Sequence, residues 1–456
     1  MRIHLIAIGG SAMHNMALSL HKKGYQVSGS DDEIREPSLS RLKAAEILPE
    51  SIGWFPEKIT KEIDAVILGM HAREDNPELI KARELGLKIY SYPEYIYEQT
   101  KDKIRIVVGG SHGKTTITAM ILHALSKNDI DCDYMVGAQL KGFDTMVKLS
   151  KEARVAVIEG DEYLASPIDR RPKFHLYHPN IAIISGIAWD HINVFPTFEN
   201  YIDQFKIFTD LIEKEGTLIY CSEDKDLVNL ESKFANHFNK IAYKTPVHKI
   251  ENGITTVFDS KGNAYPMQVF GDHNLQNMVA AYYACKEVGV EESSFYKAMQ
   301  SFTGAAKRLE LIARNGNSVC FKDFAHAPSK LKATIAAVRK QFEGYNILGS
   351  VELHTFSSLN ENFLEQYAGT SEGANKLLVY FNPSVIEHKK LKPITADQVR
   401  DAFKSSNVEV VTDSKLWQQK LKDLNNAIKN QKVLLLMSSG NFDGVDLDAL
   451  GRELVN

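Results

Sequence analysis

Short apolar runs alternate with helical patterns along the first hundred residues of this chain. Helical patterns lie near residues 12–23, 38–45 and 76–86. The runs between them are short and β-branched or apolar: IHLIAI, YQVSGS, DAVILG and KIYS. Strands that alternate with helices in this way are typical of a parallel sheet covered on both faces, so we expect a Rossmann-like α/β domain here.

A polar stretch at residues 93–103, PEYIYEQTKDK, breaks this rhythm just before a new strand, IRIVV. We therefore place the end of the first domain at residue 98 and expect a second α/β domain over residues 99–305. That domain has a helical pattern at 197–213, a hairpin-like stretch at 253–271 and two helices between 273 and 301. Its buried strands are VAVIEG, IAIISG and TLIYCS.

After SFTGAAKRLE the alternation restarts, with helices expected near 329–342 and 414–430. The strands read SVCFKDF, NILGSVEL, KLLVYF, VEVVT and VLLLMS. This pattern predicts a third, Rossmann-like domain over residues 306–456. A chain of 456 residues is also too long for one core and suits about three domains.

Composition narrows the class of partner. The chain is 44% hydrophobic and 25% charged, as in ordinary globular proteins, and its formal net charge is -4. Such a charge offers no broad basic surface for nucleic acid or anionic lipid, so small ligands are favoured. The N-terminus lacks the layout of a signal peptide, and the four cysteines form no metal or disulfide pattern. We expect a cytoplasmic protein, either a monomer or a weak homodimer.

The stretch VVGGSHGKTTIT at residues 107–118 predicts a phosphate-binding loop, because it follows the strand IRIVV and opens a helical run. Lys114 would contact the β and γ phosphates of ATP, and Thr115 or Thr116 would offer a hydroxyl to Mg²⁺. The usual G-x-x-x-x-G-K-[ST] spacing needs glycine at 108, where this chain has Val108. We therefore expect a central P-loop ATPase-like domain with a variant loop.

Acidic residues and a histidine follow two later strands. Glu159, Asp161 and Glu162 come at the end of VAVIEG, and Asp190 and His191 come after IAIISG. Carboxyl ends of strands are where ligands bind in open α/β sheets, which makes Glu159 our metal candidate. Two alternatives stay open: Asp161 and Glu162 can simply begin a solvated loop, and His191 can be a capping or packing residue.

The loop GSHGKTT, at Gly110 to Thr116, resembles the shortened phosphate loop of the Mur ligase family, the ATP-dependent amide-forming enzymes of peptidoglycan assembly. Further motifs in the same order extend this resemblance over essentially the whole chain. They are IAIGGSAM, VSGSD and EDNPELIKARELG in the first domain, GDHNLQN and FTGAAKRLE in the second, and KDFAHAP in the third. Two glycines usual in the family are Ala7 and Ala12 here.

The resemblance implies which residues bind each ligand. A UDP-sugar is expected in the first domain at Gly9, Gly10, Ser30, Asp31, His71 and Asn76. ATP is expected at Gly110, Ser111, His112, Gly113, Lys114, Thr115, Thr116, Asn274, Asn277, Arg308 and Asp323. Mg²⁺ is expected at Thr115 and Glu159, with a second ion at His191.

The family's chemistry gives these residues roles. The lactyl carboxylate of UDP-N-acetylmuramate attacks the γ-phosphate of ATP, and an amine then attacks the resulting acyl phosphate. Lys114 and the metal would offset the repulsion between anions. His326 or His191 would accept the amine's proton, while His326 can alternatively only fix its loop. Asp323 would order the ribose or that same loop.

Two local sequence motifs resemble those of the family member that attaches a recovered murein tripeptide, L-alanyl-γ-D-glutamyl-meso-diaminopimelate. They favour this member over the one that adds L-alanine. The runs are EGDEYLASPIDRRPKFHLYHP and MSSGNFDG. Three residues depart from the family's motifs: Ala188 replaces a glutamate, Ala327 a histidine, and Thr355 lies where an arginine is usual. These departures leave open a relative that binds UDP-muramyl compounds without ligating them. An oxidoreductase is disfavoured because the first domain has no G-x-G-x-x-G.

Overall fold

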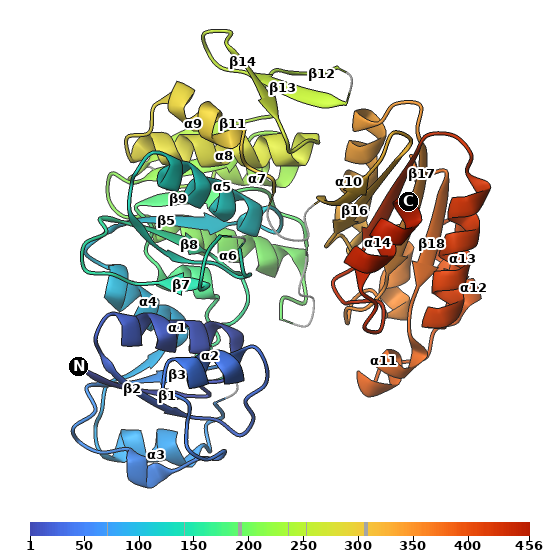
Figure 1. The fold of residues 1–456 in the computed structure, drawn as a ribbon. Helices are drawn as coiled ribbons and strands as arrows, with labels where there is room; N and C mark the ends of the chain where they lie inside the picture. Colours follow the sequence, from blue (N-terminus) through green and yellow to red (C-terminus); the bar gives the residue numbers. More distant parts are fainter. Residues whose placement is uncertain (71, 141, 190–193, 236, 252, 305–308) are drawn as a thin grey trace. The chain divides into compact units, whose positions relative to one another are not determined.

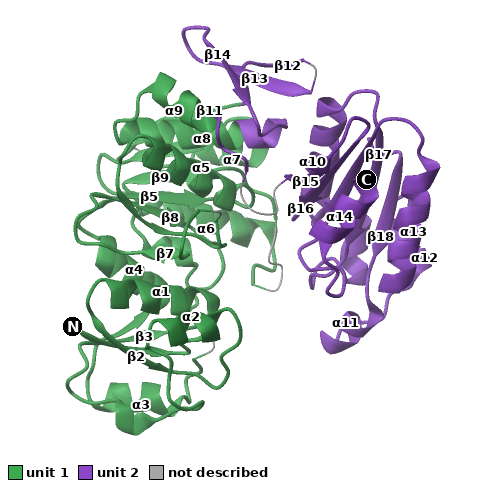
Figure 2. Ribbon diagram, viewed as in Figure 1, with its two compact units in different colours: residues 1–244, 276–299 green, residues 245–275, 300–456 purple. Residues whose placement is uncertain are grey.

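The structure is a computed structural model that describes every residue except 71, 141, 190–193, 236, 252 and 305–308 (Figure 1). The chain divides into two compact units. The first contains residues 1–244 and 276–299, and the second contains residues 245–275 and 300–456 (Figure 2).

A four-stranded parallel sheet, in the order β2-β1-β3-β4, begins the first unit. Its strands are β1 (Arg2–Ile6), β2 (Gln26–Ser30), β3 (Ala65–Leu68) and β4 (Ile89–Ser91). Around it lie α1 (Ser11–Lys22), α2 (Ser38–Ala44), a 3-10 turn (Pro56–Lys58), α3 (Pro77–Glu84) and α4 (Tyr92–Thr100). The strands and helices expected before residue 92 are confirmed.

The polar stretch at 93–103 is not a break, and this expectation was wrong. It forms most of α4, because Ser91 caps the helix in a capping box with Glu94 and Pro93 occupies the first turn. The expected domain limit at residue 98 therefore falls within a helix. That limit and the one at 305, which lies outside the described residues, stay predictions.

A seven-stranded sheet, in the order β11-β10-β9-β5-β8-β6-β7, completes the first unit; only β7 runs antiparallel to its neighbour. The strands are β5 (Ile104–Gly109), β6 (Cys132–Met135), β7 (Val147–Lys148), β8 (Val155–Glu159), β9 (Ile181–Ile184), β10 (Thr217–Cys221) and β11 (Asn239–Tyr243). The helices are α5 (Lys114–Lys127), a 3-10 turn (Lys173–Leu176), α6 (Phe198–Asp210), α7 (Lys225–Glu231), α8 (Asp272–Glu287) and α9 (Glu292–Met299). The first turn of α8 belongs to the second unit.

The second unit contains an antiparallel three-stranded sheet, of β12 (His248–Glu251), β13 (Ile254–Phe258) and β14 (Ala264–Met267), where a hairpin was expected. Its six-stranded sheet has the order β15-β16-β20-β17-β18-β19. Those strands are β15 (Glu310–Arg314), β16 (Ser318–Asp323), β17 (Asn346–Glu352), β18 (Lys376–Tyr380), β19 (Val408–Val411) and β20 (Lys432–Met437). The helices are α10 (Pro328–Gln341), a 3-10 turn (Glu361–Tyr367), α11 (Pro383–His388), α12 (Ala396–Ala402), α13 (Ser414–Ala427) and α14 (Leu447–Val455).

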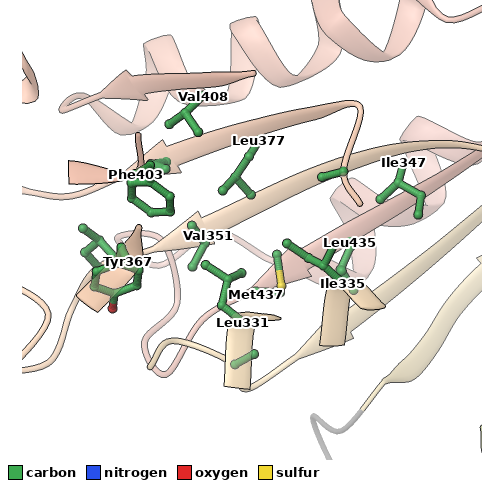
Figure 3. Packing of buried hydrophobic residues seen from close by; sticks show 14 of the residues in the cluster. Leu331, Ile335, Ile347, Val351, Tyr367, Leu377, Phe403, Val408, Leu435 and Met437 are labelled. Atoms are coloured by element: carbon green, nitrogen blue, oxygen red, sulfur yellow. The ribbon is translucent and has the colours of Figure 1, made fainter. Parts of the chain in front are cut away.

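Both faces of this sheet are buried, which explains its uninterrupted apolar strands. On one face Leu435 and Met437 of β20 pack with Leu331 and Ile335 of α10 (Figure 3). Leu434 and Leu436 point to the other face, with Trp417 of α13. Successive strand residues alternate between faces, so a strand covered on both sides has to be apolar throughout.

The architecture is the three-domain α/β fold expected from the sequence. Cys132, Cys221, Cys285 and Cys320 are all buried and free. Among the described residues, no helix combines the length and apolarity needed to span a bilayer.

A buried carboxylate supports the first sheet. The Glu78 and His4 side chains are fully buried, with Glu78 Oε2 3.1 Å from His4 Nε2, and Glu78 Oε1 accepts a 2.7 Å hydrogen bond from Phe55 N. Burial alone would raise the pKa of Glu78, but the hydrogen bonds from His4 and Phe55 N hold it below its usual value of 4.5. A lowered folded-state pKa stabilises the fold above that value, and the stabilisation is lost as the pH falls.

We predict that Glu78→Ala lowers the free energy of unfolding by about 3 kcal/mol at pH 7, because it leaves buried donors without an acceptor. Urea unfolding between pH 3.5 and 7 measures this. The wild-type protein should lose stability below about pH 4.5 more steeply than the variant. The matched control is Glu84→Ala on the exposed side of α3, which should change stability by less than about 1 kcal/mol. Equal effects of the two substitutions would contradict the prediction.

Candidate active site

The phosphate loop joins β5 to α5. Gly110 and Gly113 adopt φ angles of 120° and 79°, which favour glycine. A Cβ atom at Gly110 would lie 2.2 Å from Ser185 Oγ, and one at Gly113 would lie 2.3 Å from Asn277 Oδ1. Because α5 begins at Lys114, the backbone N–H groups of its first turn are available to an anion. The loop has the form that its sequence predicts.

Lys114 is held at the start of α5 by two acceptors. Its Nζ donates to Gly110 O at 2.7 Å and to Glu162 Oε2 at 2.6 Å, and Glu162 is only 1% exposed. Burial lowers the pKa of Lys114, but Glu162 and the other nearby carboxylates more than offset this and raise it. Lys114 therefore keeps its charge at neutral pH.

The solvated-loop alternative for Asp161 and Glu162 is wrong for Glu162. Besides Lys114, its carboxylate accepts a hydrogen bond from Tyr201 OH at 3.3 Å, and that hydroxyl lies 2.7 Å from Ser111 Oγ. Asp161 is partly exposed and accepts a 2.6 Å hydrogen bond from Lys173 Nζ. Glu162 thus connects the phosphate loop to α6.

Glu159 lies at the carboxyl end of β8, beside the loop. Thr115 Oγ1 donates to its Oε1 at 2.9 Å, and Gly137 N donates to its Oε2 at 2.9 Å. Burial raises the pKa of Glu159, although Gly137, Lys114 and Thr115 partly oppose it. A buried carboxylate with a raised pKa is stabilised in its charged form by a cation, and Mg²⁺ prefers carboxylate and hydroxyl oxygens. Thr115 and Glu159 therefore fit one Mg²⁺; Thr116 lies buried within α5.

The second metal contact expected at His191, and Asp190 beside it, lie outside the described residues. Within the described part of the chain, no group of three or more His, Cys, Asp and Glu side chains gathers in a metal-binding arrangement. Ala188, one of the departures, donates its N–H to Ser111 Oγ at 2.9 Å. Trp189 follows with 46% of its surface exposed.

The expected nucleotide residues beyond the loop fall into different parts of the molecule. Asn277 packs against Gly113 of the phosphate loop. Asn274 belongs to the second unit and donates to Phe270 O at 2.9 Å. Arg308 lies outside the described residues.

Asp323 is the last residue of β16 in the second unit, and His326 lies in the loop that follows it. Asp323 accepts hydrogen bonds from Leu309 N at 2.7 Å and Ala325 N at 2.8 Å, so its carboxylate orders this loop. His326 Nδ1 lies 2.8 Å from Phe324 O, an arrangement in which Nδ1–H donates and Nε2 is the basic nitrogen. Ala327 precedes α10 as its N-cap.

A pocket of about 920 Å³ opens beyond the carboxyl ends of β1, β2 and β3. Its walls include Gly9, Gly10, Trp54, Asp31, Asn76 and Pro167. Asp31 Oδ2 accepts a 2.7 Å hydrogen bond from Gly9 N, and burial raises the pKa of Asp31. The pocket therefore brings together most of the residues expected to bind the UDP-sugar.

Two residues of that prediction also support the local fold. Asn76 also caps α3, since its Oδ1 accepts from Glu78 N and Leu79 N. Ser30 is buried, and its carbonyl accepts from Ala7 N at 2.9 Å. Ala7 has a φ of 65°, a conformation that favours the glycine usual in the family. His71 lies outside the described residues.

Sequence reasoning missed a polar cluster at the carboxyl ends of β17 and β20. Glu352, 2% exposed, accepts hydrogen bonds from Phe442 N at 2.9 Å and from Ser438 Oγ. His354 Nδ1 lies 3.6 Å from Glu352 Oε1. Glu159 was singled out because ligands bind at the carboxyl ends of strands in open α/β sheets. The same argument would have pointed to this polar cluster, because the runs NILGSVE and VLLLMS also end in polar residues.

This chain is similar in sequence to known proteins. Residues 2–103 match the model described as Mur ligase family, catalytic domain, and residues 108–285 match the Mur ligase middle domain. The UDP-N-acetylmuramate--L-alanine ligase of Caldicellulosiruptor bescii is 31% identical over 387 residues, covering 82% of each chain.

Two solved structures share the fold over the full length of the chain. The murein peptide ligase of Psychrobacter arcticus has a TM-score of 0.64 at 22% identity, with 100% of this chain and 99% of that one covered. The UDP-N-acetylmuramate-alanine ligase of Thermotoga maritima has a TM-score of 0.67 at 20% identity, with 100% and 98% covered. The resemblance of the phosphate loop is confirmed: the chain belongs to the Mur ligase family of ATP-dependent, amide-bond-forming ligases.

Proposed function

We propose that this enzyme joins the lactyl carboxylate of UDP-N-acetylmuramate to the amine of an amino acid or peptide, through an acyl phosphate formed with ATP. The observation that carries the proposal is the grouping of Lys114, Thr115 and Glu159 around one phosphate loop. Lys114 supplies positive charge where phosphate would bind, and Thr115 and Glu159 supply oxygen ligands for Mg²⁺.

Each ligand has a place in this proposal. The backbone N–H groups at the start of α5 would receive the phosphates of ATP, and Mg²⁺ would neutralise part of their charge. Asn277, packed against Gly113, would fix the loop. The pocket at Gly9, Gly10 and Asp31 would receive the sugar nucleotide, because its volume of about 920 Å³ is ample for a nucleotide-sized ligand.

Two acceptors have separate support. L-Alanine is supported by the similarity to relatives named as UDP-N-acetylmuramate--L-alanine ligases, which extends over 97% of this chain in one case and 82% in another. The murein tripeptide is supported by the sequence motifs at residues 159–179 and 437–444.

We predict that Lys114→Ala lowers the rate of ligation by at least about 10³-fold, because the charge facing the transferred phosphoryl group is lost. ADP release in the presence of UDP-N-acetylmuramate and an acceptor measures the rate. Lys127→Ala, at the far end of the same helix, is the matched control and should keep normal activity. Near-normal ADP release by Lys114→Ala would refute the assignment.

We predict that ADP release with UDP-N-acetylmuramate depends on an acceptor, and that the acceptor identifies the family member. One of the two acceptors, L-alanine or the tripeptide, should stimulate ADP release at least about tenfold more than the other does. The reason is that a site built to hydrogen-bond one acceptor leaves polar groups unpaired when the other acceptor binds. Mass spectrometry of the product checks the assignment. Activity with L-alanine alone would exclude the tripeptide function, and activity with neither would favour a binding protein.

We predict that His326→Gln lowers the maximal rate by about 10²-fold and flattens the dependence of the rate on pH, because glutamine cannot accept the proton of the attacking amine. Rates between pH 5.5 and 9 measure this. His388→Gln, at the exposed end of α11, is the control and should keep the wild-type profile. An unchanged profile in His326→Gln would assign this residue a loop-fixing role only.

A further inference from the structure

Asn15 is a fully buried amide in the second turn of α1, and all of its hydrogen-bonding capacity is used. Its Nδ2 donates to Ser11 O at 2.8 Å and lies 3.0 Å from His14 Nε2. Its Oδ1 accepts from Met146 N at 3.0 Å and from Arg41 Nη1 at 3.1 Å. Breaking such a buried network leaves unpaired polar groups, which is costly, so these atoms hold one arrangement.

On one side the network reaches the loop that forms the wall of the sugar-nucleotide pocket. His14 Nδ1 lies 3.0 Å from Gly10 O and 3.0 Å from Ser38 Oγ, which donates to Gly9 O at 2.7 Å. Because Gly10 O only accepts, Nδ1 carries the proton, and Nε2 accepts from Asn15. The positions of Gly9 and Gly10 are thereby tied to the amide of Asn15.

On the other side the network reaches the metal candidate. Met146, whose N–H binds Asn15, accepts through its carbonyl from Val136 N at 2.9 Å. The next residue, Gly137, donates to Glu159 Oε2, and Glu159 Oε1 accepts from Thr115. A Cβ atom at Gly137 would lie 2.7 Å from Glu159 Oε1, so backbone and carboxylate are in close contact. The helix α1 and the strand β7 lie side by side within this unit (Figure 1).

We infer that Asn15 and His14 are positioning residues that couple occupancy of the sugar-nucleotide pocket to the geometry of the Thr115–Glu159 site. This inference rests on the proposed function. A sugar nucleotide that fixes the Gly9–Gly10 loop would favour the arrangement of Val136 and Gly137 in which Glu159 faces Thr115. Coupling between binding sites is reciprocal, so Mg²⁺ and ATP would tighten sugar-nucleotide binding by the same factor.

The test is calorimetric titration of the full-length enzyme with UDP-N-acetylmuramate, with and without Mg²⁺ and a non-hydrolysable ATP analogue. We expect the wild-type enzyme to bind at least about 5-fold more tightly when the analogue is present. In Asn15→Ala this ratio should fall to about 1. Asn15→Asp keeps an oxygen that can accept from Met146 N, so its affinity ratio should lie between those of the wild-type enzyme and Asn15→Ala.

Asn425→Ala is the matched control. Asn425 is also a buried helical amide, donating to Leu454 O at 3.0 Å, but it lies in the second unit. It should lower stability and leave the ratio unchanged. An unchanged ratio in Asn15→Ala, or a wild-type ratio of 1, would overturn the coupling. Absence of any sugar-nucleotide binding by the wild-type enzyme would instead overturn the proposed function, and the coupling with it.

A second measurement needs no ligand. Burial lowers the pKa of His14, and Arg41 is the charged group that lowers it further. Asn15→Asp places a carboxylate where Nδ2 now donates to Nε2, so it should raise the pKa of His14 by at least about 1. NMR titration of histidine-labelled protein measures this. An unchanged His14 pKa would show that Asn15 does not face Nε2, and it would overturn the inferred connection even if the enzyme is active.

Discussion

The ion pair between Lys114 and Glu162 is the interaction on which the active site depends. Glu162 is buried and Lys114 is nearly so, with 1% and 14% of their side chains exposed, and a buried charge without its partner is strongly disfavoured. The start of α5 and the loop after β8 must therefore lie together, although 48 residues separate them. The hydroxyl of Tyr201, a residue of α6, donates to Glu162 and so connects this ion pair to that helix. The parallel order of β5 and β8 makes this meeting possible, because their carboxyl ends lie at one edge of the sheet.

This pair also bears on the balance of charge during ligation. Because Lys114 is already paired with Glu162, its charge alone offsets only part of the charge of a triphosphate and a second carboxylate. Glu159, whose pKa burial raises, lies where a divalent cation would meet this need. The electrostatic contribution of the loop is therefore best understood as a joint property of Lys114, Glu159, Glu162 and the Mg²⁺ that we propose here.

The sequence predicted well what depends on local pattern. Apolar runs identified the buried strands, and the glycines with Lys114 identified the phosphate loop, because both signals lie within a few residues. It failed where a distant partner decides. Glu162, for example, pairs with Lys114, which is 48 residues away in sequence. The helix α4 was missed for a different reason, because the local capping box of Ser91 and Glu94 was overlooked. The network around Asn15 had no sequence signal, since Met146 meets it only in the folded chain.

The chain has three tryptophans, and each reports on a different environment. Trp54 lines the pocket that also contains Gly9, Trp189 is half exposed in the loop after β9, and Trp417 is fully buried against Phe442 with ring centroids 4.2 Å apart. Their intrinsic fluorescence therefore gives the enzyme three built-in optical probes. With single substitutions to phenylalanine, quenching from Trp54 can follow sugar-nucleotide binding and emission from Trp417 can follow unfolding of the second unit, without any attached dye.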